Sequence, residues 1–273
     1  MKIKAFATDL DGTLLYKNEI SQSNLKAIES LKESGVIPIF VTGRIYTSAL
    51  YYAKKHGLNI PIIGCNGAVV ANVEGEIISY NPIEDEVSMK IAELCNKNNL
   101  YYHFYDLNTF YSRVMRANRI KHLTKSMDED ILFQVDMMFS DNAIYRAIER
   151  GEGIAKFVIN VSEEKVEELF SSLDLSKIEI TKSGPHSIEI MKSGITKYKG
   201  LEILADYYDL NINQIAAIGD YDNDIPMIEN AGYGIAMDNA LESVKEHADY
   251  ITLSNVDDGV SAAIKHLYEE GLI

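Results

Sequence analysis

The chain has 273 residues, of which 47% are hydrophobic and 25% are charged, and its formal net charge is −15 with a pI near 4.8. This length allows two domains with buried cores, and the composition is that of an ordinary globular protein. The negative charge disfavours nucleic acid and anionic membranes as partners, so an anionic substrate needs a local positive site or a cation.

The apolar stretches have the length of strands, and none approaches the roughly 20 residues of a membrane span. No basic region followed by an apolar segment and a cleavage site marks export. The two cysteines, Cys65 and Cys95, are too few for a disulfide framework and lack metal-site spacing. We therefore expect a cytoplasmic protein with reduced thiols.

The first 81 residues alternate between apolar strands and amphipathic helices. The expected elements, in chain order, are a strand at residues 3–7, a helix at 21–35 with a serine cap and a glycine stop, a strand at 36–44, a helix at 47–58, and a strand at 61–70 with a turn at Asn66 and Gly67. Such alternation predicts an α/β fold with a Rossmann-like, doubly wound parallel sheet.

The pattern changes between residues 82 and 187. Here we expect helices at 86–100 and 163–173, and strands at 101–114, 131–140, 177–184 and 187–191. Paired strands with helices segregated between them predict an inserted α+β cap domain with an antiparallel sheet.

The alternation resumes after the insert, with helices at 197–210 and 259–271 and strands at 215–220, 233–237 and 249–252. We therefore predict one core domain made of residues 1–81 and 188–273, and a second domain made of residues 82–187.

Two aspartates, Asp9 and Asp11, follow the first strand, and Gly12 and Thr13 then turn the chain. Residues i and i+2 of an extended segment point to the same side, so the two carboxylates are expected to be neighbours. A strand that is apolar on both faces belongs in the centre of a parallel sheet, and ligands bind beyond the carboxyl ends of such strands. Aspartate and glycine are also ordinary turn residues, so this stretch alone decides nothing.

Further polar residues stand at later strand ends. Thr42 ends the second strand, Lys197 stands at the start of the helix expected at 197–210, and residues 219–224 carry three acids after a buried strand. Because parallel strands bring their carboxyl ends to one edge, these groups are expected to converge there. Carboxylate oxygens with room for water and phosphate suit Mg²⁺.

A carboxylate beside Mg²⁺ can attack a phosphoryl group and form an aspartyl phosphate. A second aspartate two residues later can protonate the leaving oxygen and then activate water. The metal, a lysine, a threonine hydroxyl and the backbone amides of the turn, at Leu10 and Gly12, would meet the charge of the transferring phosphoryl.

Taken together, these motifs resemble the haloacid dehalogenase-like superfamily of phosphatases, and within it the Cof-type subfamily, whose cap is inserted between the second and third motifs. DLDGTLL, VTGR, CNGA, GITK, GDYDNDIPM, GIAMDNA and DDGVSAAI occur in the order of that family. The resemblance implies that Asp9 is the nucleophile and Asp11 the general acid and base. It also implies Mg²⁺ on the Asp9 carboxylate, the Asp11 backbone carbonyl and Asp220, with Asp224 supporting the site.

By the same resemblance, Thr42 and Lys197 bind the phosphoryl group, and Gly43 and Asn223 line it. The family pattern Gly-Val-Ser-Lys aligns with Gly-Ile-Thr-Lys at residues 194–197. A glycine often follows that lysine, whereas this chain continues with Tyr198, so Lys199 stays an alternative.

Two further stretches of the sequence each allow a functional and a structural interpretation. The aromatic stretch 101–112 could stack on a substrate or form the core of the cap sheet, and the acid-free stretch 113–125 could attract a phosphate or be a solvated surface. The role of Arg44 is open, and Asp222 is expected to face solvent. Ser183, His186 and Ser187 are candidates for specificity because cap segments near this point reach over the site in the Cof-type subfamily.

We conclude that the sequence favours a Mg²⁺-dependent phosphatase that acts on phosphomonoesters of small soluble metabolites, such as sugar phosphates, through an aspartyl phosphate. The cap is expected to exclude water and to select the leaving group. A phosphomutase and a catalytically silent sensor of phosphorylated metabolites remain as alternatives.

Overall fold

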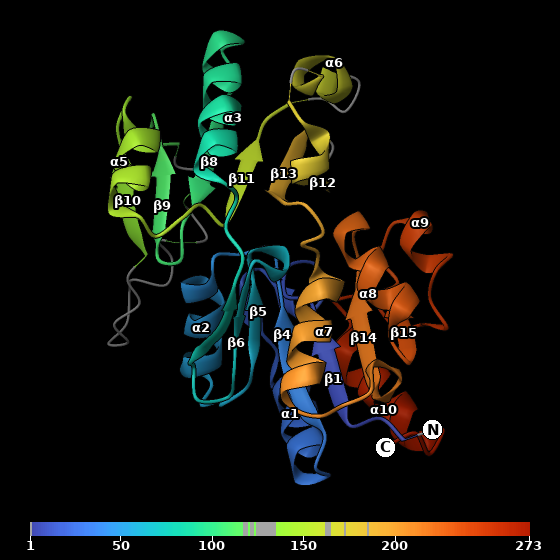
Figure 1. Ribbon diagram of the computed structural model, residues 1–273. Helices are drawn as coiled ribbons and strands as arrows, with labels where there is room; N and C mark the ends of the chain where they lie inside the picture. Colours follow the sequence, from blue (N-terminus) through green and yellow to red (C-terminus); the bar gives the residue numbers. More distant parts are fainter. Residues whose placement is uncertain are drawn as a thin grey trace.

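The computed structural model contains two large β-sheets, one above the other in the view of Figure 1. It describes residues 2–116, 120, 123, 135–161, 165–171, 173–184 and 186–273. The strands of the larger sheet come from two stretches of the chain, and the strands of the smaller sheet lie between these stretches in the sequence. The chain passes from the larger sheet to the smaller one after β7 (Ile77–Tyr80) and returns after β13 (Ser187–Lys192).

The larger sheet has the order β16-β15-β14-β1-β4-β5-β6-β7. Its remaining strands are β1 (Ala5–Thr8), β4 (Ile37–Val41), β5 (Ile62–Gly64), β6 (Val69–Ala71), β14 (Ile215–Gly219), β15 (Tyr233–Ala236) and β16 (Tyr250–Ile251). The strands from β16 to β5 are parallel, whereas β6 and β7 are antiparallel to their neighbours. β1 lies between β14 and β4 and is buried throughout, as its continuous apolar pattern predicts.

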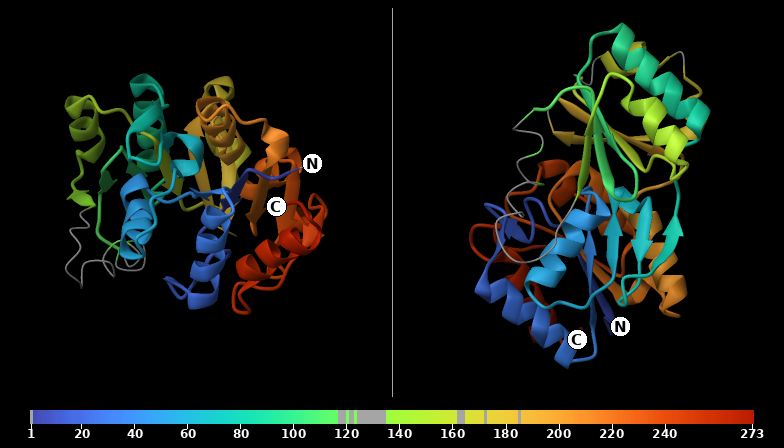
Figure 2. Two further views of the ribbon diagram at one scale, coloured as in Figure 1. Left: turned by 90° about the horizontal axis from the view of Figure 1, so that it is seen from below. Right: turned by 90° about the vertical axis from the view of Figure 1, so that its left-hand side faces the viewer.

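Helices cover both faces of this sheet. They are α1 (Gln22–Glu33), α2 (Tyr46–Lys55), α7 (Lys197–Tyr207), α8 (Ile225–Asn230), α9 (Glu242–Lys245) and α10 (Gly259–Glu269). α1 packs against α10, α7 packs against α8, and the right-hand view of Figure 2 shows α1 and α7 on opposite sides of the sheet. The predicted doubly wound α/β core is thereby confirmed.

The first helix shows how local sequence defines these elements. Ser21 caps α1 by accepting a hydrogen bond from the backbone N–H of Asn24 at 3.1 Å, and the apolar stripe Leu25, Ile28 and Leu31 is buried. Gly35, in the left-handed conformation with φ of 76°, ends the turn after the helix.

The smaller sheet has the order β10-β9-β8-β11-β13-β12. Its remaining strands are β8 (Tyr102–Tyr105), β9 (Thr109–Ser112), β10 (Asp136–Phe139), β11 (Lys156–Ile159) and β12 (Ile178–Gly184), and its helices are α3 (Asp85–Lys97), α5 (Ala143–Arg150) and α6 (Val166–Phe170). One face of the sheet packs with residues of these helices in a second hydrophobic core, separate from that of the larger sheet.

The structure corrects several expectations for the insert. The sequence analysis assigns no element to residues 141–162, yet α5 and β11 lie there. α5 is short and has no side-chain N-cap hydrogen bond, but Arg150 in its last turn and Gly151 as its left-handed C-cap were usable signals. The predicted strand at 101–114 is a hairpin of β8 and β9, and a further hairpin, β2 (Leu15–Tyr16) with β3 (Glu19–Ile20), was missed.

The smaller sheet was expected to be antiparallel, but β9 and β10 are parallel. A tight hairpin turn joins only antiparallel strands, so the parallel pairing rules one out between β9 and β10. The predicted end of the insert at residue 187 is also too early, because β13 pairs with both β11 and β12 as far as Lys192. Most of the segment 113–125, residues 131–134 of the predicted strand at 131–140, and part of the predicted helix at 163–173 lie outside the described residues.

In the part of the chain that the structure describes, no helix is both long and apolar enough to cross a membrane.

A close backbone contact joins α7 to the turn between β5 and β6. Gly67 has a φ of 99°, and a Cβ atom there would overlap the carbonyl oxygen of Thr196 and lie 3.3 Å from the backbone nitrogen of Gly200. Only glycine permits both the left-handed conformation and this approach. The contact brings the N-terminal end of α7 to the carboxyl edge of the larger sheet.

We predict that Gly67→Ala lowers the free energy of unfolding by about 3 kcal/mol or more, because it adds overpacking to a strained φ. The matched control is Gly35→Ala, which has a similar φ strain but no described heavy atom within 4 Å of its added Cβ. This control should lose only about 1 kcal/mol. Urea unfolding of the two variants provides the comparison, and equal losses would show that the contact with α7 is not tight.

Candidate active site

A cavity of about 420 Å³ lies between the two sheets, at the carboxyl edge of the larger one. The predicted site residues that line it are Asp9, Asp11, Thr42, Gly43, Lys197, Asp220, Asn223 and Asp224. The structure thus brings together side chains that follow β1, β4 and β14 and one that begins α7. The described lining residues do not include the remaining two, Leu10 and Gly12.

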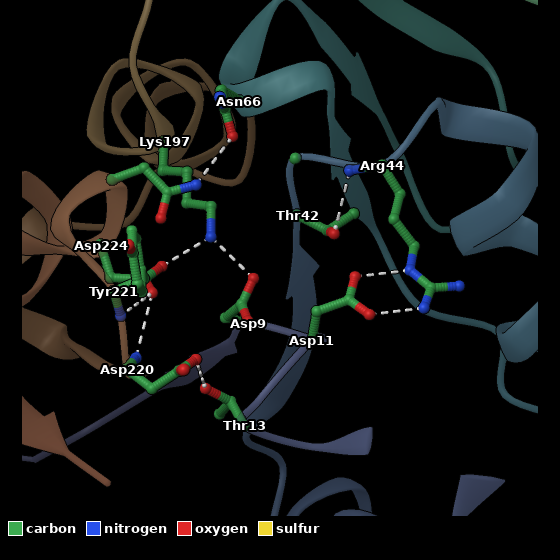
Figure 3. Close-up of polar contacts among 12 residues, drawn as sticks. Asp9, Asp11, Thr13, Thr42, Arg44, Asn66, Lys197, Asp220, Tyr221 and Asp224 are labelled. Atoms are coloured by element: carbon green, nitrogen blue, oxygen red, sulfur yellow. Dashed lines mark hydrogen bonds and ion pairs between the residues drawn. The ribbon is translucent and has the colours of Figure 1, made fainter. Parts of the chain in front are cut away.

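The centre of the site is the ammonium group of Lys197 (Figure 3). Its Nζ donates to Oδ1 of Asp9 and to Oδ1 of Asp224, both at 2.6 Å, and all three side chains are at most 6% exposed. Lys199, the alternative lysine, points elsewhere and pairs with Glu202 at 3.1 Å on the surface. Lys197 is therefore the lysine that faces the acids.

The loop after β14 is held by Asp224 and Thr13. Oδ2 of Asp224 accepts hydrogen bonds from the backbone N–H groups of Asp220 and Tyr221, both at 3.0 Å. The Thr13 hydroxyl donates to Oδ1 of Asp220 at 2.8 Å. Thr13 was not predicted as a site residue, although its place in the DGT turn was a usable signal. These bonds fix Asp220 beside Asp9 (Figure 3).

Gly12 leaves room for the carboxylate of Asp220, because it has no side chain. Its φ is 85°, and a Cβ atom there would overlap the carboxylate of Asp220, with Oδ1 at 2.9 Å. Leu10 contributes only backbone, since its side chain is fully buried and its carbonyl accepts the N–H of Leu15 at 2.8 Å. Whether the Leu10 and Gly12 amides meet a phosphoryl group stays a prediction.

Burial and crowded charge perturb the acids. Burial raises the pKa of Asp9 well above its ordinary value, and the charges of Asp224, Asp220 and Asp11 raise it further, against the opposing effect of Lys197. Burial and the charge of Asp224 likewise raise the pKa of Asp220 to about 7. The two carboxylates that surround Lys197 raise the pKa of its ammonium against the effect of burial, so it stays protonated.

The acids around Lys197 suit a divalent cation. Asp9, Asp220 and Asp224 can each offer one oxygen, and these oxygens lie within 4.8 Å of one another. With Asp11, four carboxyl groups face two fixed cations, Lys197 and Arg44, so full ionisation of the acids would leave two negative charges in excess. A hard cation with oxygen ligands offsets that excess, and the donor set therefore fits Mg²⁺.

Asp11 faces a different cation from Asp9. Its side chain is 57% exposed and accepts hydrogen bonds from Nε and Nη2 of Arg44 at 2.6 and 2.5 Å. β1 ends at Thr8, so the alternation of an extended strand does not extend to Asp11 and the two carboxylates diverge (Figure 3). The role of Arg44, open in the sequence, is to hold Asp11 at the rim of the cavity.

Arg44 is itself fixed by the core. Burial alone would lower the pKa of its guanidinium, but the hydrogen bond and the charge of Asp11 raise it above its ordinary value. Nη1 donates to the Tyr52 hydroxyl at 3.1 Å, and Nη2 donates to Oδ1 of Asn18 at 3.2 Å. Asn18 lies in the connection between β2 and β3 and was not predicted.

Residues of the smaller sheet close the cavity from above. Lys156 lies opposite Tyr105, and Val158 lies opposite both His103 and Glu189, so these five side chains share one face, which lines the cavity. The alternate residues of β8 and β11, such as Tyr102, Phe104 and Phe157, pack in the second core. The aromatic stretch therefore forms the core of the smaller sheet on one face and lines the cavity on the other, and stacking on a substrate stays a prediction.

Of the three candidates for specificity near the end of the insert, two line the cavity. Ser183 and Ser187 line the cavity, whereas the exposed His186 is absent from its described lining. Asp222 does not simply face solvent, because it is half-buried and accepts a hydrogen bond from the Ser243 hydroxyl at 3.1 Å. Asn66, Lys156 and Glu189 were not predicted as site residues. For Lys156 and Glu189, a single charge within the apolar stretches AKFVIN and SIEIM was a usable signal.

The cysteines take no part in this chemistry. Both are free and buried, and burial raises the pKa of Cys65 and of Cys95 to about 12. Each thiol is therefore protonated at neutral pH, as expected for structural cysteines.

Comparison with known proteins gives concordant results. The family model described as haloacid dehalogenase-like hydrolase matches residues 6–264. The chain is 32% identical to the 5-amino-6-(5-phospho-D-ribitylamino)uracil phosphatase YitU of Bacillus subtilis strain 168, over 96% of each chain. Among solved structures, it is similar to a haloacid dehalogenase-like hydrolase from B. subtilis, with a TM-score of 0.85, 26% identity, and 97% of this chain and 100% of that chain covered. A haloacid dehalogenase-like hydrolase from Bacteroides thetaiotaomicron has a TM-score of 0.81 and 28% identity, with the same coverage of 97% and 100%.

We predict that Lys197→Met lowers the free energy of unfolding at neutral pH by about 3–5 kcal/mol, because it leaves Asp9 and Asp224 buried without their counter-charge. Lys199→Met removes the same charge two residues away, from an exposed pair, and should change stability by about 0.5 kcal/mol or less. Urea unfolding without divalent metal tests both variants. Equal stability of Lys197→Met and the wild type would contradict the view that this ammonium balances the acids.

Proposed function

The chain belongs to the haloacid dehalogenase-like hydrolases and is a phosphatase, and we propose that it hydrolyses phosphomonoesters of small metabolites through an aspartyl phosphate on Asp9. The observation that carries this proposal is the convergence of Asp9, Lys197 and the acids Asp220 and Asp224 in one largely buried cluster at the base of the cavity between the two sheets. A binding module has no need for a nucleophile and a second acid two residues later.

In the first step, an oxygen of the Asp9 carboxylate forms a bond to phosphorus, and the bond from phosphorus to the leaving oxygen breaks. A proton from the Asp11 carboxyl goes to that leaving oxygen. Lys197, the Thr42 hydroxyl and the Asn223 amide would bind the phosphoryl oxygens as charge develops on them. Their presence along the cavity supports these roles.

In the second step, a water oxygen forms a bond to phosphorus, and the bond to Asp9 breaks to release phosphate and the free carboxylate. Asp11 accepts the proton of that water, and so returns to its acid form. The pairing with Arg44 supports this step, because the guanidinium stabilises the ionised carboxylate that must act as the base.

A Mg²⁺ ion would be held by Asp9 and Asp220, with Asp224 beside them, and a contribution of the Asp11 backbone carbonyl stays a prediction. When bound, it would offset the excess charge of the acids and stabilise the transferring phosphoryl. The acids of this chain support that role because Lys197 and Arg44 balance only part of their charge.

The substrate is proposed to be a small phosphorylated metabolite with a hydroxyl-bearing leaving group. The cavity of about 420 Å³ can hold a leaving group of sugar size, and Ser183, Ser187 and Tyr105 offer it hydroxyl partners. The relative YitU is named for a substrate that carries a phosphorylated ribityl chain. The proposed class fits both facts, and a cytoplasmic location stays a prediction.

We predict that Mg²⁺ raises the midpoint of thermal unfolding of the wild type, because a ligand that binds only the folded state stabilises it, by about 2.7 kcal/mol at one hundred times its Kd. Asp220→Asn should lose most of this shift. Asp222→Asn, which removes a neighbouring acid bonded to Ser243, should keep it. An equal shift in both variants would place the bound ion away from the acid cluster.

We predict that the wild type releases inorganic phosphate from a panel of sugar, alditol and nucleotide monophosphates in the presence of Mg²⁺ and not in the presence of chelator. Asp9→Asn should lower kcat by at least about a thousandfold, as expected when a nucleophile is removed. Asp11→Asn should lower it by about a hundredfold to ten-thousandfold, the usual contribution of a general acid and base.

Asp222→Asn is again the matched control and should retain activity. Phosphate release that persists in Asp9→Asn would rule out the aspartyl phosphate. Substrate binding without phosphate release would instead favour a sensor, and isomerised substrate that depends on a bisphosphate activator would favour a phosphomutase.

A further inference from the structure

A buried ion pair lies in the roof of the cavity, on the smaller sheet. Nζ of Lys156, in β11, donates to Oε1 of Glu189, in β13, at 2.8 Å, and the two side chains are 2% and 9% exposed. Buried ion pairs add little net stability, since desolvation of the charges offsets their attraction, and apolar residues of the same size often serve as well. Stability alone therefore does not explain a charge pair at this position.

Both members of the pair also contact the larger sheet. Lys156 Nζ donates to the backbone carbonyl of Gly43, in the loop after β4. Oε2 of Glu189 accepts from Nδ2 of Asn66 at 2.5 Å, and Oδ1 of Asn66 accepts from Nδ2 of Asn223 at 3.3 Å. The pair is thus connected to two segments that carry proposed phosphate-binding residues.

The contact with Gly43 leads to Thr42 through a single peptide group. The carbonyl of that group accepts from Lys156, and its N–H, which belongs to Arg44, donates to Oγ1 of Thr42 at 3.1 Å. Because Oγ1 accepts this bond, the hydrogen of the Thr42 hydroxyl remains for donation to another oxygen. An ammonium on the carbonyl also polarises the peptide and strengthens the donation by its N–H.

We propose that Lys156 and Glu189 are positioning residues for phosphoryl transfer, which hold the Thr42 hydroxyl and the Asn223 amide in place from the opposite sheet. This inference rests on the proposed phosphatase function. Phosphoryl binding then depends on the docking of the smaller sheet, because the last contacts that orient Thr42 and Asn223 come from β11 and β13. A substrate that draws the sheets together completes its own binding site.

The test measures the affinity of orthovanadate, a phosphate analogue without a leaving group, in the presence of Mg²⁺. It compares the wild type, Lys156→Met, Thr42→Val and the double variant. Vanadate offers nothing for the roof to recognise as a leaving group, so an effect of Lys156 passes either through the phosphate-binding residues or directly through its charge on the cavity, and the Thr42→Val background separates the two. We expect Lys156→Met to weaken binding by about tenfold to a hundredfold, the scale of a misplacement near 1 Å.

In the Thr42→Val background, Lys156→Met should weaken binding by no more than about twofold, because residues that act through one another are not additive. Additive losses, or no loss in Lys156→Met alone, would overturn the proposal. Lys177→Met is the matched control. It also removes a lysine of the insert, but one that forms an exposed pair with Glu84 at 2.7 Å. It should leave vanadate affinity and kcat unchanged.

The variant that combines Lys156→Met with Glu189→Met distinguishes a positioning role of the pair from a purely structural one. This variant removes both buried charges and should recover the unfolding temperature lost in Lys156→Met. Vanadate affinity should remain low, whereas its recovery together with stability would overturn the positioning role.

The proposed function and this inference fail in different ways. A wild type that releases no phosphate from any substrate contradicts the hydrolase, while the vanadate cycle still decides the role of Lys156. A wild type that hydrolyses substrates normally while the Lys156 variants bind vanadate with full affinity contradicts only the inference. If the wild type neither hydrolyses nor binds vanadate, both are wrong.

Discussion

The ammonium of Lys197 between Asp9 and Asp224 is the interaction on which the site depends. Burial of several carboxylates at one sheet edge is unfavourable unless cations meet them, and Lys197 supplies one such cation from the first turn of α7. Its position requires α7 to approach the β5–β6 turn closely, which the glycine at position 67 permits. The charge balance of the site is therefore built into the packing of the core.

Asp9 and Asp11, both in the loop after β1, pair with different cations in different surroundings. Asp9 is buried beside Lys197, where burial strengthens every charge interaction, whereas Asp11 lies at the rim and pairs with Arg44. In the proposed mechanism, the nucleophile gains a fixed position away from bulk water, and the group that exchanges protons with water gains partial exposure. The divergence of the two carboxylates, although they are only two residues apart, provides both environments.

The smaller sheet joins this arrangement through side chains that alternate across it. The apolar residues of β8, β11 and β13 pack in their own core, while the residues between them line the cavity. A strand that supports a separate core can therefore also present Lys156 and Glu189 to the larger sheet. The insert is thus positioned to contribute both to the shape of the cavity and to the placement of Thr42 and Asn223.

The sequence by itself determined the doubly wound core, the order of the motifs and the convergence of Asp9, Thr42 and Asp220, because parallel strands that end in polar residues must bring those ends to one edge. Only the tertiary structure decided which lysine faces the acids, that Arg44 holds Asp11, that Thr13 holds Asp220, and that β13 belongs to the smaller sheet. The physical reason is that hydrophobic periodicity and turn signals act over short stretches of chain. The partner of a charged side chain, in contrast, is set by which distant segments the packing brings within hydrogen-bond distance.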